Sequence, residues 1–338
     1  MSASQAVMNI ALSRIHQFEL EWIVALQGLG DWEQWMTWIS RLGWNALPYG
    51  VAFVYFCISR RTGARFYLLF SFNISLLHSL KMVFHSPRPY WLDARIQASS
   101  GAGNYGMPSG HVFGASITWP FLAKTINRPW AWLIALVVVF LVSVSRVYLG
   151  AHFFSDLVVA WGIAAVLLWL YHRLEPTLTA KLRRLGVFQQ IGIGFCATAV
   201  LLMTGFGVDL FLDGVVDPPA WAESAANARS LTGLFESSGQ FFGAACGVAM
   251  CSRWSPFEIP LAWSSRLMAL AYALLNGWLV NELWTMIPTP QDHLLWLGWE
   301  FLRGAFPKCW IIFVVPWILL KMGFLRRASK DVDLSGDG

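Results

Sequence analysis

Three short polar segments stand out in a sequence that is otherwise strongly apolar. They are the run from Lys81 to Arg88, the run Pro108-Ser109-Gly110-His111, and a third segment that contains Arg146, His152 and Asp156. Together they supply what chemistry on a phosphate group needs: cations and hydrogen-bond donors for the non-bridging oxygens, and histidines for nucleophilic and acid–base steps. We therefore expect the three segments to meet in one site.

Five of these residues are expected to bind the phosphate group: Lys81, Arg88, Ser109, Gly110 and Arg146. Lysine gives a compact positive charge, and each arginine can contact two oxygen atoms at once. Ser109 and Gly110 would open a helix, where free backbone amides bind anions, and glycine permits a close approach of the backbone. About three positive charges would then face a phosphate group that carries about −1.5 to −2.

The two histidines and Asp156 have a spacing suited to covalent catalysis. His152 and Asp156 are four residues apart, so on a helix they would share one face. The carboxylate can then hold one ring nitrogen of His152 and leave the other free to attack phosphorus. His111 can protonate the leaving oxygen and later activate the water that hydrolyses the phosphohistidine.

The composition places these residues in a membrane protein. Hydrophobic residues make up 57% of the chain and charged residues only 13%, against about 25% in an ordinary soluble domain. The 20 tryptophans agree, because indole rings concentrate at membrane–water interfaces. The basic residues lie between apolar stretches rather than in one solvated patch, so the net charge of +5 does not indicate nucleic-acid binding.

Several apolar stretches approach the length of about 20 residues that a helix needs to cross a bilayer. The expected spans are 44–59, 66–84, 109–126, 131–147, 152–171, 187–205, 232–251, 267–286 and 299–320. The predicted fold class is therefore all-α: a polytopic membrane helical bundle of about nine transmembrane helices.

Charges between the spans predict the topology. Most of the 24 Lys and Arg residues lie in loops on one side, which the positive-inside rule makes cytoplasmic. Asp209, Asp213, Asp217 and Glu223 lie in a loop on the other side. The N terminus is then outside and the C terminus inside. All three polar segments fall at helix ends on the non-cytoplasmic side, so four helix ends can surround one pocket.

Four consecutive parts follow from this reading of the chain. Residues 1–43 are predicted to form an interfacial segment, because charged residues interrupt what would be the apolar core of a signal peptide. Residues 44–175 are the catalytic membrane core with the three polar segments, 176–322 add C-terminal membrane helices, and 323–338 are expected to be a disordered cytoplasmic tail. The five cysteines and the histidines lack the spacing of a metal site, so we expect neither a metal nor another cofactor.

The three polar segments resemble the motifs of the type 2 phosphatidic acid phosphatase superfamily. That superfamily includes lipid phosphate phosphatases, glucose-6-phosphatases, bacterial acid phosphatases and vanadium haloperoxidases. The resemblance covers residues 81–156 and implies phosphate binding by the five residues named above. It also implies that His111 is the acid, His152 the nucleophile and Asp156 its orienting partner, and that hydrolysis requires no metal.

The resemblance leaves several functions open. The first is hydrolysis of a lipid phosphate or diphosphate, because a pocket at helix ends near the interface suits an amphiphile. A sugar phosphatase is the alternative, since Arg88-Pro89-Tyr90-Trp91 and the number of spans resemble the glucose-6-phosphatases, whereas Asp156 is closer to the lipid phosphatase pattern. Transfer of the phosphate to an alcohol would make the chain a phosphotransferase. The intact polar segments argue against a non-catalytic membrane scaffold, and the apolar spans argue against a haloperoxidase.

The expected location is a prokaryotic cytoplasmic membrane, with the site on the extracytoplasmic face. An endoplasmic reticulum membrane with a lumenal site would show the same charge pattern. Membrane lipids are the expected surroundings, and the sequence leaves the oligomeric state open.

Overall fold

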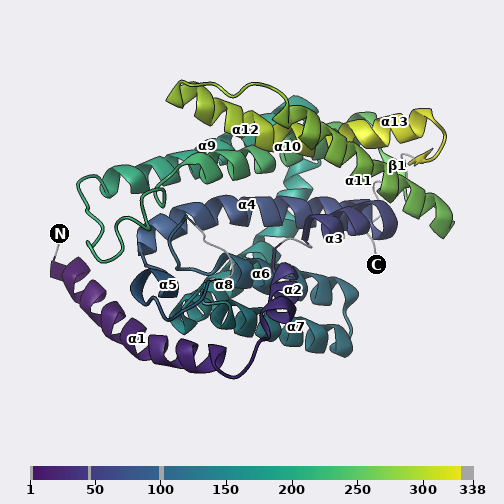
Figure 1. Cartoon of the computed structure of the whole chain (residues 1–338). Coiled ribbons are helices and arrows are strands. Elements are labelled where there is room, and N and C mark those ends of the chain that lie inside the picture. Colours follow the sequence, from purple (N-terminus) through teal and green to yellow (C-terminus); the bar gives the residue numbers. More distant parts are fainter. Residues whose placement is uncertain (1–2, 45–46, 99–102, 329–338) are drawn as a thin grey trace. The chain divides into compact units, whose positions relative to one another are not determined.

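The computed structural model describes residues 3–44, 47–98 and 103–328, and this part of the chain is almost entirely helical (Figure 1). The helices that precede and carry the three polar segments are α1 (Ala3–Gln27), α2 (Glu33–Arg41), α3 (Leu47–Phe53), the π-helical η1 (Val54–Ile58), α4 (Arg60–Phe84), α5 (Pro89–Leu92), α6 (Gly110–Ile126), α7 (Pro129–Tyr148) and α8 (Phe154–Leu182). The later helices are α9 (Val187–Phe211), α10 (Thr232–Trp254), α11 (Trp263–Thr285), α12 (His293–Cys309), the π-helical η2 (Trp310–Val314) and α13 (Val315–Lys321).

The all-α membrane class is confirmed, whereas the count of nine spans is not. Within the described residues, five segments are long and apolar enough to cross a membrane: Arg60–Leu92, Pro129–Tyr148, Phe154–Leu182, Val187–Phe211 and His293–Lys321. The expected first span is the short apolar helix Leu47–Ile58. Helix α6 has 17 residues, and α10 and α11 have 23 each but are more polar than the five.

The chain divides into two compact units that are interleaved along the sequence. Unit 1 consists of Met1–Leu47, Leu76–Arg173 and Thr204–Ser230, and unit 2 consists of Pro48–Ser75, Leu174–Met203 and Leu231–Gly338. The domains predicted from the sequence are consecutive segments, so they follow different boundaries. All the predicted site residues lie in unit 1.

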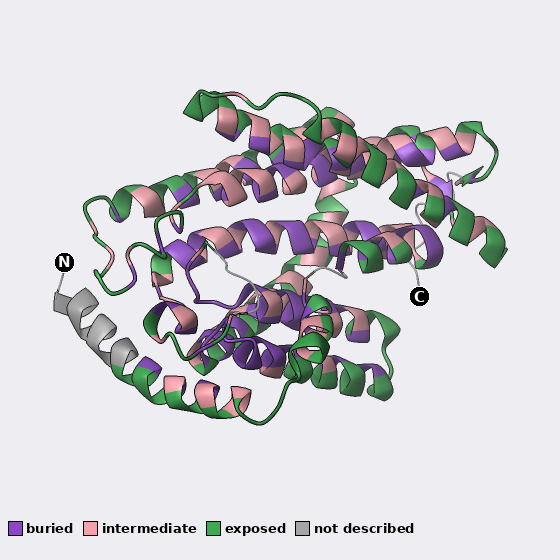
Figure 2. Ribbon diagram, viewed as in Figure 1, coloured by how far each residue is buried: buried purple, intermediate pink, exposed green. Residues whose placement is uncertain are grey.

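Within unit 1, α6 packs against α7, and α1 and α2 also contact α7. Burial increases along α7 towards its C-terminal end, as Figure 2 shows. Apolar side chains such as Leu133, Leu136 and Phe140 are exposed in its first part, whereas Arg146 and the residues beside it are buried. Exposed apolar residues on a long apolar helix are what contact with lipid requires.

Within unit 2, α10 and α12 pack most closely where glycines allow their backbones to touch. A Cβ atom at Gly239, Gly243 or Gly304 would collide with the backbone of the facing helix. Small residues at such contacts are typical of helix pairs in membranes. The Tyr55 hydroxyl also donates to the Ile312 carbonyl oxygen at 2.9 Å, which joins η1 to η2 inside the unit.

The structure describes helix α1 near the N terminus and a short strand near the C terminus. Helix α1 forms within the segment expected to be interfacial, and its place relative to a membrane stays a prediction. The tail expected to be disordered from residue 323 contains a short ordered strand, β2 (Arg326–Arg327), which pairs antiparallel with β1 (Phe257–Glu258). Backbone pairing therefore orders residues 326–327, and residues 329–338 of the predicted tail lie outside the described residues.

Breaks between helices place each polar segment at a helix end. Helix α4 ends at Phe84, and His85 then adopts a left-handed backbone with φ of 46°. Ser109 is the N-cap of α6, and Gly150, with φ of 63°, follows the end of α7. Glycine adopts that conformation without strain, so the chain can turn sharply between α7 and α8.

Candidate active site

The first polar segment places two cations around one loop. Lys81, in the last turn of α4, donates from Nζ to the carbonyl oxygens of Tyr105 at 2.6 Å and Gly106 at 3.2 Å. Arg88 precedes α5 and donates from Nε to the Asn104 carbonyl oxygen at 2.7 Å and from Nη1 to the Ala151 carbonyl oxygen at 2.9 Å. Both side chains are buried, and backbone carbonyl groups hold both of them.

The second segment opens α6 as the sequence predicts. Ser109 is its N-cap and Gly110 its first residue, so the amides of the first turn have no intrahelical acceptor. The Ser109 N–H donates to the backbone oxygen of Asp156 at 3.2 Å, which ties this helix end to the start of α8. A side chain at Gly43 would collide with the His111 carbonyl oxygen, so Gly43 lets the preceding chain pass directly beside the helix.

The third polar segment differs from the prediction in one respect, because only one of its two residues His152 and Asp156 lies on the helix. His152 lies in the turn before α8, and Asp156 lies in the first turn of that helix. The predicted contact still forms, because Asp156 Oδ2 lies 3.1 Å from His152 Nδ1. The same oxygen accepts the Phe153 N–H at 3.1 Å, so one carboxylate fixes both the histidine ring and the backbone of the turn.

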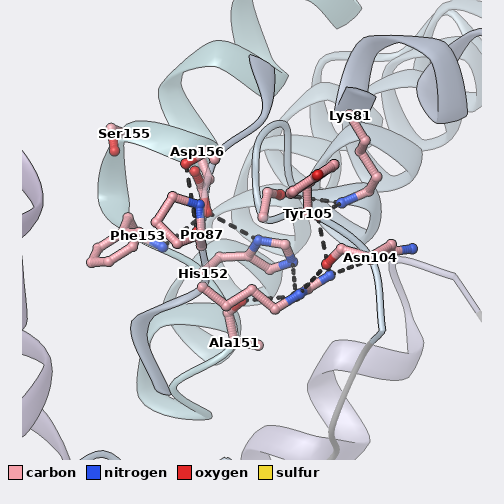
Figure 3. A network of polar contacts seen from close by, with 12 residues as sticks. Lys81, Pro87, Asn104, Tyr105, Ala151, His152, Phe153, Ser155 and Asp156 are labelled. Carbon is pink, nitrogen blue, oxygen red and sulfur yellow. Dashed lines mark hydrogen bonds and ion pairs between the residues drawn. The ribbon is translucent and has the colours of Figure 1, made fainter. Parts of the chain in front are cut away.

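Within unit 1 the first and third segments meet at His152, which lies beside Asp156 in Figure 3. The backbone bond from Ser109 to Asp156 joins the second segment to them. One side of the imidazole faces Asp156, and on the other side Nε2 lies 3.5 Å from Arg88 Nη1. A proton on Nδ1, directed at the carboxylate, leaves the Nε2 lone pair directed towards the cations. His111 is close enough to Arg146, Lys81 and Arg88 for their charges to act on it.

Positive charge accumulates here without matching negative charge. Lys81, Arg88 and Arg146 are between 3% and 7% exposed, and within the described residues none has a carboxylate at ion-pair distance. In that same part of the chain, Ser109 Oγ and Arg146 Nε are buried donors that have no hydrogen-bond partner. Buried charges and donors of this kind are costly unless an anion accompanies them. The arrangement is therefore suited to binding a compact anion.

Several residues that support the site were not predicted from the sequence. Ser40, at the end of α2, accepts a hydrogen bond from Arg146 Nη1 at 2.8 Å, and nothing in the local sequence marks it. Asn104 accepts from Arg88 through both its backbone and its side chain. A side chain at Gly106 would meet Pro87 O and Asp156 Oδ2, so this glycine lets the loop approach the carboxylate. Tyr105, whose carbonyl oxygen accepts from Lys81, is completely buried.

Helix α1 also contacts the turn that carries His152. The His16 ring stacks on the Phe153 ring with centroids 4.0 Å apart and an interplanar angle of 9°. Glu19 accepts hydrogen bonds from the Ser155 N–H at 2.9 Å and from Ser155 Oγ at 3.1 Å. The N-terminal segment thus supports the first turn of α8.

One family model and two known proteins match parts of this chain. The family model of the PAP2 superfamily matches residues 63–180, which include all the predicted site residues. The undecaprenyl-diphosphatase of Sulfolobus acidocaldarius is 27% identical over 158 residues, which cover 46% of this chain and 73% of that protein. The lipid A 4'-phosphatase of Bacteroides thetaiotaomicron is 32% identical over 117 residues, which cover 34% of this chain and 49% of that protein. No solved structure matches the chain.

The match and the two relatives agree with the resemblance stated from the motifs. Residues 63–180, which we call the family segment, begin in α4 and end in α8. They contain Lys81 and Arg88, the start of α6 and the His152–Asp156 pair. Residues 63–180 of this chain match the PAP2 superfamily, the family that the motifs of the three polar segments resemble.

Proposed function

We propose that the chain is an integral membrane phosphatase that hydrolyses a phosphate ester or diphosphate of a lipid through a phosphohistidine intermediate. The observation that carries the proposal is the group of buried cations beside His152, with no carboxylate paired to them among the described residues. A phosphate group would supply the missing negative charge and place its phosphorus near the free ring nitrogen.

The first chemical step uses the two faces of His152. Nε2 attacks phosphorus and the bond from phosphorus to the leaving oxygen breaks. The proton stays on Nδ1 of His152, and Asp156 accepts its hydrogen bond and stabilises the positive charge that develops on the ring. His111 protonates the leaving oxygen. Lys81, Arg88, Arg146, Ser109 and the Gly110 amide hold the non-bridging oxygens and stabilise their charge in the transition state.

The second step returns the enzyme to its starting state. A water molecule gives a proton to His111 and attacks the phosphohistidine, and the phosphorus–nitrogen bond breaks to release inorganic phosphate. The lone pair returns to Nε2 of His152. An alcohol in place of water would give a phosphotransferase with the same residues.

The names of the two relatives support a lipid substrate. One is named for undecaprenyl diphosphate and the other for lipid A, so both names point to a phosphate group attached to a lipid. The helices around the site are apolar and exposed apolar side chains cover part of α7, which suits a substrate whose tail stays in the membrane. The charge pattern of the loops favours a site on the extracytoplasmic face of a prokaryotic cytoplasmic membrane.

Phosphate release by the purified full chain in detergent tests the proposal. The substrates are undecaprenyl diphosphate, phosphatidic acid and glucose-6-phosphate, and the control is His152→Ala. We expect release from the lipids that is lost in the variant. Preference for glucose-6-phosphate would replace the lipid substrate by a sugar phosphate, transfer to added glycerol would indicate a phosphotransferase, and no release from any substrate would support a non-catalytic protein.

A further inference from the structure

Residues 212–230, which we call the 212–230 segment, direct three side chains at the loop that holds the cations. This segment follows α9, belongs to unit 1 and lies outside the family match at 63–180. Two of its polar side chains, those of Asp217 and Arg229, meet the phenol of Tyr105, and Trp221 packs against the Tyr105 ring. These contacts join positions more than 100 residues apart in the sequence.

The Tyr105 hydroxyl both donates and accepts a hydrogen bond. The hydroxyl donates to Asp217 Oδ1 at 3.1 Å and accepts from Arg229 Nε at 3.2 Å. Burial is the largest cause of the rise in the pKa of Tyr105 to about 12, so the phenol keeps the proton that it donates. Arg229 is itself fixed, because Nη1 donates to the Leu212 carbonyl oxygen at 3.1 Å and Nη2 to the Val215 carbonyl oxygen at 2.6 Å.

The same segment also fixes His85, which lies between the two cations of the first polar segment. His85 Nε2 lies 2.5 Å from Asp217 Oδ1, so Nε2 carries a proton, and Arg229 Nη2 at 3.3 Å is a neighbour rather than a second donor to it. The left-handed backbone of His85 is uncommon for a residue with a side chain and needs surrounding contacts to persist. The Tyr105 and Trp221 rings, with centroids 4.5 Å and 5.7 Å from the imidazole, supply further contacts.

Apolar packing closes the contact between the 212–230 segment and the loop. Trp221 stacks on Trp91 with centroids 5.8 Å apart, and both rings are 7% exposed. Ala225 and Ala228 are buried in the same cluster. Burial of two indole rings stabilises this arrangement by the hydrophobic effect, so the segment is held by more than its polar contacts.

Tyr105 connects this cluster to the phosphate-binding cations. Its side chain meets the 212–230 segment, and its backbone oxygen accepts hydrogen bonds from Lys81 Nζ at 2.6 Å and Arg88 Nη2 at 3.4 Å. Two cations that approach the same carbonyl oxygen repel each other, and the repulsion is strong where water is excluded. Holding them together before an anion binds therefore requires a loop that is itself anchored.

We propose that the 212–230 segment is a clamp that holds Lys81 and Arg88 in their phosphate-binding positions, with Asp217, Arg229 and Tyr105 as positioning residues. The proposal rests on the proposed function, because it assumes that these cations bind the phosphate group. None of the three positioning residues needs to touch the substrate. Their contribution is to reduce the rearrangement that the cations would otherwise undergo when phosphate binds.

The test measures binding of inorganic phosphate and orthovanadate to the full-length protein by calorimetry in detergent, which does not depend on turnover. The variants are Asp217→Asn, Tyr105→Phe and the double variant, and Arg229→Lys is an additional variant. The matched control is Asp213→Asn, which removes a negative charge from an exposed position of the same segment. Melting temperatures identify any variant that fails to fold.

We expect each single variant to bind phosphate about 10-fold more weakly. Tyr105→Phe loses its hydrogen bonds to charged groups, and Asp217→Asn loses the negative charge that strengthens the bond from Tyr105. The double variant should be no weaker than the worse single variant, because both changes break the same connection. Lipid hydrolysis should show a raised KM with a smaller change in kcat, and the control should match the parent.

The outcomes separate this inference from the proposed function. Wild-type affinity in folded Asp217→Asn and Arg229→Lys proteins, or losses that add in the double variant, would overturn the clamp even if the parent hydrolyses lipid phosphates. A parent that binds phosphate through the clamp but hydrolyses no substrate would refute the proposed function alone. A parent that binds neither anion would refute both.

Discussion

Substitution of Asp156 tests the geometry around the proposed nucleophile. The side chain is completely buried, and Oδ2 receives both the His152 ring at 3.1 Å and the Phe153 N–H at 3.1 Å. A buried hydrogen bond to a charged group contributes about 1.5–3 kcal/mol. Since about 1.4 kcal/mol corresponds to a factor of ten, Asp156→Ala should lower kcat roughly 10- to 150-fold.

Asp156→Asn should be milder than Asp156→Ala. The amide oxygen of Asn can still accept from the Phe153 N–H, but the negative charge that stabilises the developing imidazolium is lost. Charge-assisted hydrogen bonds are about twice as strong as neutral ones, so about half of the free energy should remain and kcat should fall about 4- to 12-fold. The KM should stay close to the parent value, because the substitution leaves the cations and the backbone contact from the Ser109 N–H to Asp156 unchanged.

The assay is rapid-quench measurement of phosphoenzyme formation and breakdown with a radiolabelled substrate. Both variants should form the phosphoenzyme slowly, in the order parent, Asn, Ala. Melting temperatures check that the turn before α8 still folds. Phosphoenzyme formation at the parent rate in Asp156→Ala would refute the reasoning, and an Asn variant slower than the Ala variant would show that the charge is not the main contribution.

Four other outcomes are expected. His111→Asn should slow release of poor leaving groups most, as measured with a series of phenyl phosphates, and an equal loss for all of them would contradict its role as the acid. Arg146→Lys keeps the charge but loses the hydrogen bond to Ser40 and the second contact to phosphate, so the affinity for orthovanadate should fall about 10-fold. An unchanged affinity would show that Arg146 does not bind the anion. Glu19→Ala should lower kcat about 10-fold, because the first turn of α8 loses its hydrogen bonds to Glu19. Glu19→Gln keeps an acceptor for Ser155 and should have a kcat between those of the parent and Glu19→Ala. A kcat for Glu19→Gln as low as that of Glu19→Ala would argue against positioning through Ser155. Incubation with a chelator should leave turnover intact, and a loss restored by magnesium would refute metal-independent hydrolysis.

The sequence predicted the parts of the site that depend on local rules. Ser109 and Gly110 open α6, and the His152–Asp156 spacing gives the expected contact even though His152 lies just before the helix. A spacing of four residues brings side chains together over one turn, whether or not the first residue is fully helical. The motifs at helix ends therefore needed little information about the tertiary structure.

Contacts between residues far apart in the sequence could not be predicted from local patterns. Ser40 reaches Arg146 across 106 residues, and Asp217 reaches Tyr105 across 112. Their residue types are common and their local patterns carry no signal of those partners. The span count is not confirmed for another reason. It includes α6, which is short, and α10, which contains polar residues such as Glu236, the partner of Arg303 within unit 2.

The interleaving of the two units bears on how the protein is synthesised. Unit 1 is completed by Thr204–Ser230, which reaches the ribosome exit long after the family segment has emerged. A fragment cut at residue 180 would keep every predicted site residue and still lack Asp217, Trp221 and Arg229. Until that last stretch is translated, the Tyr105 hydroxyl lacks Asp217 and Arg229, and the loop that holds Lys81 and Arg88 has not yet made its contacts with the 212–230 segment. The catalytic unit therefore matures late in translation, although its motifs are made early.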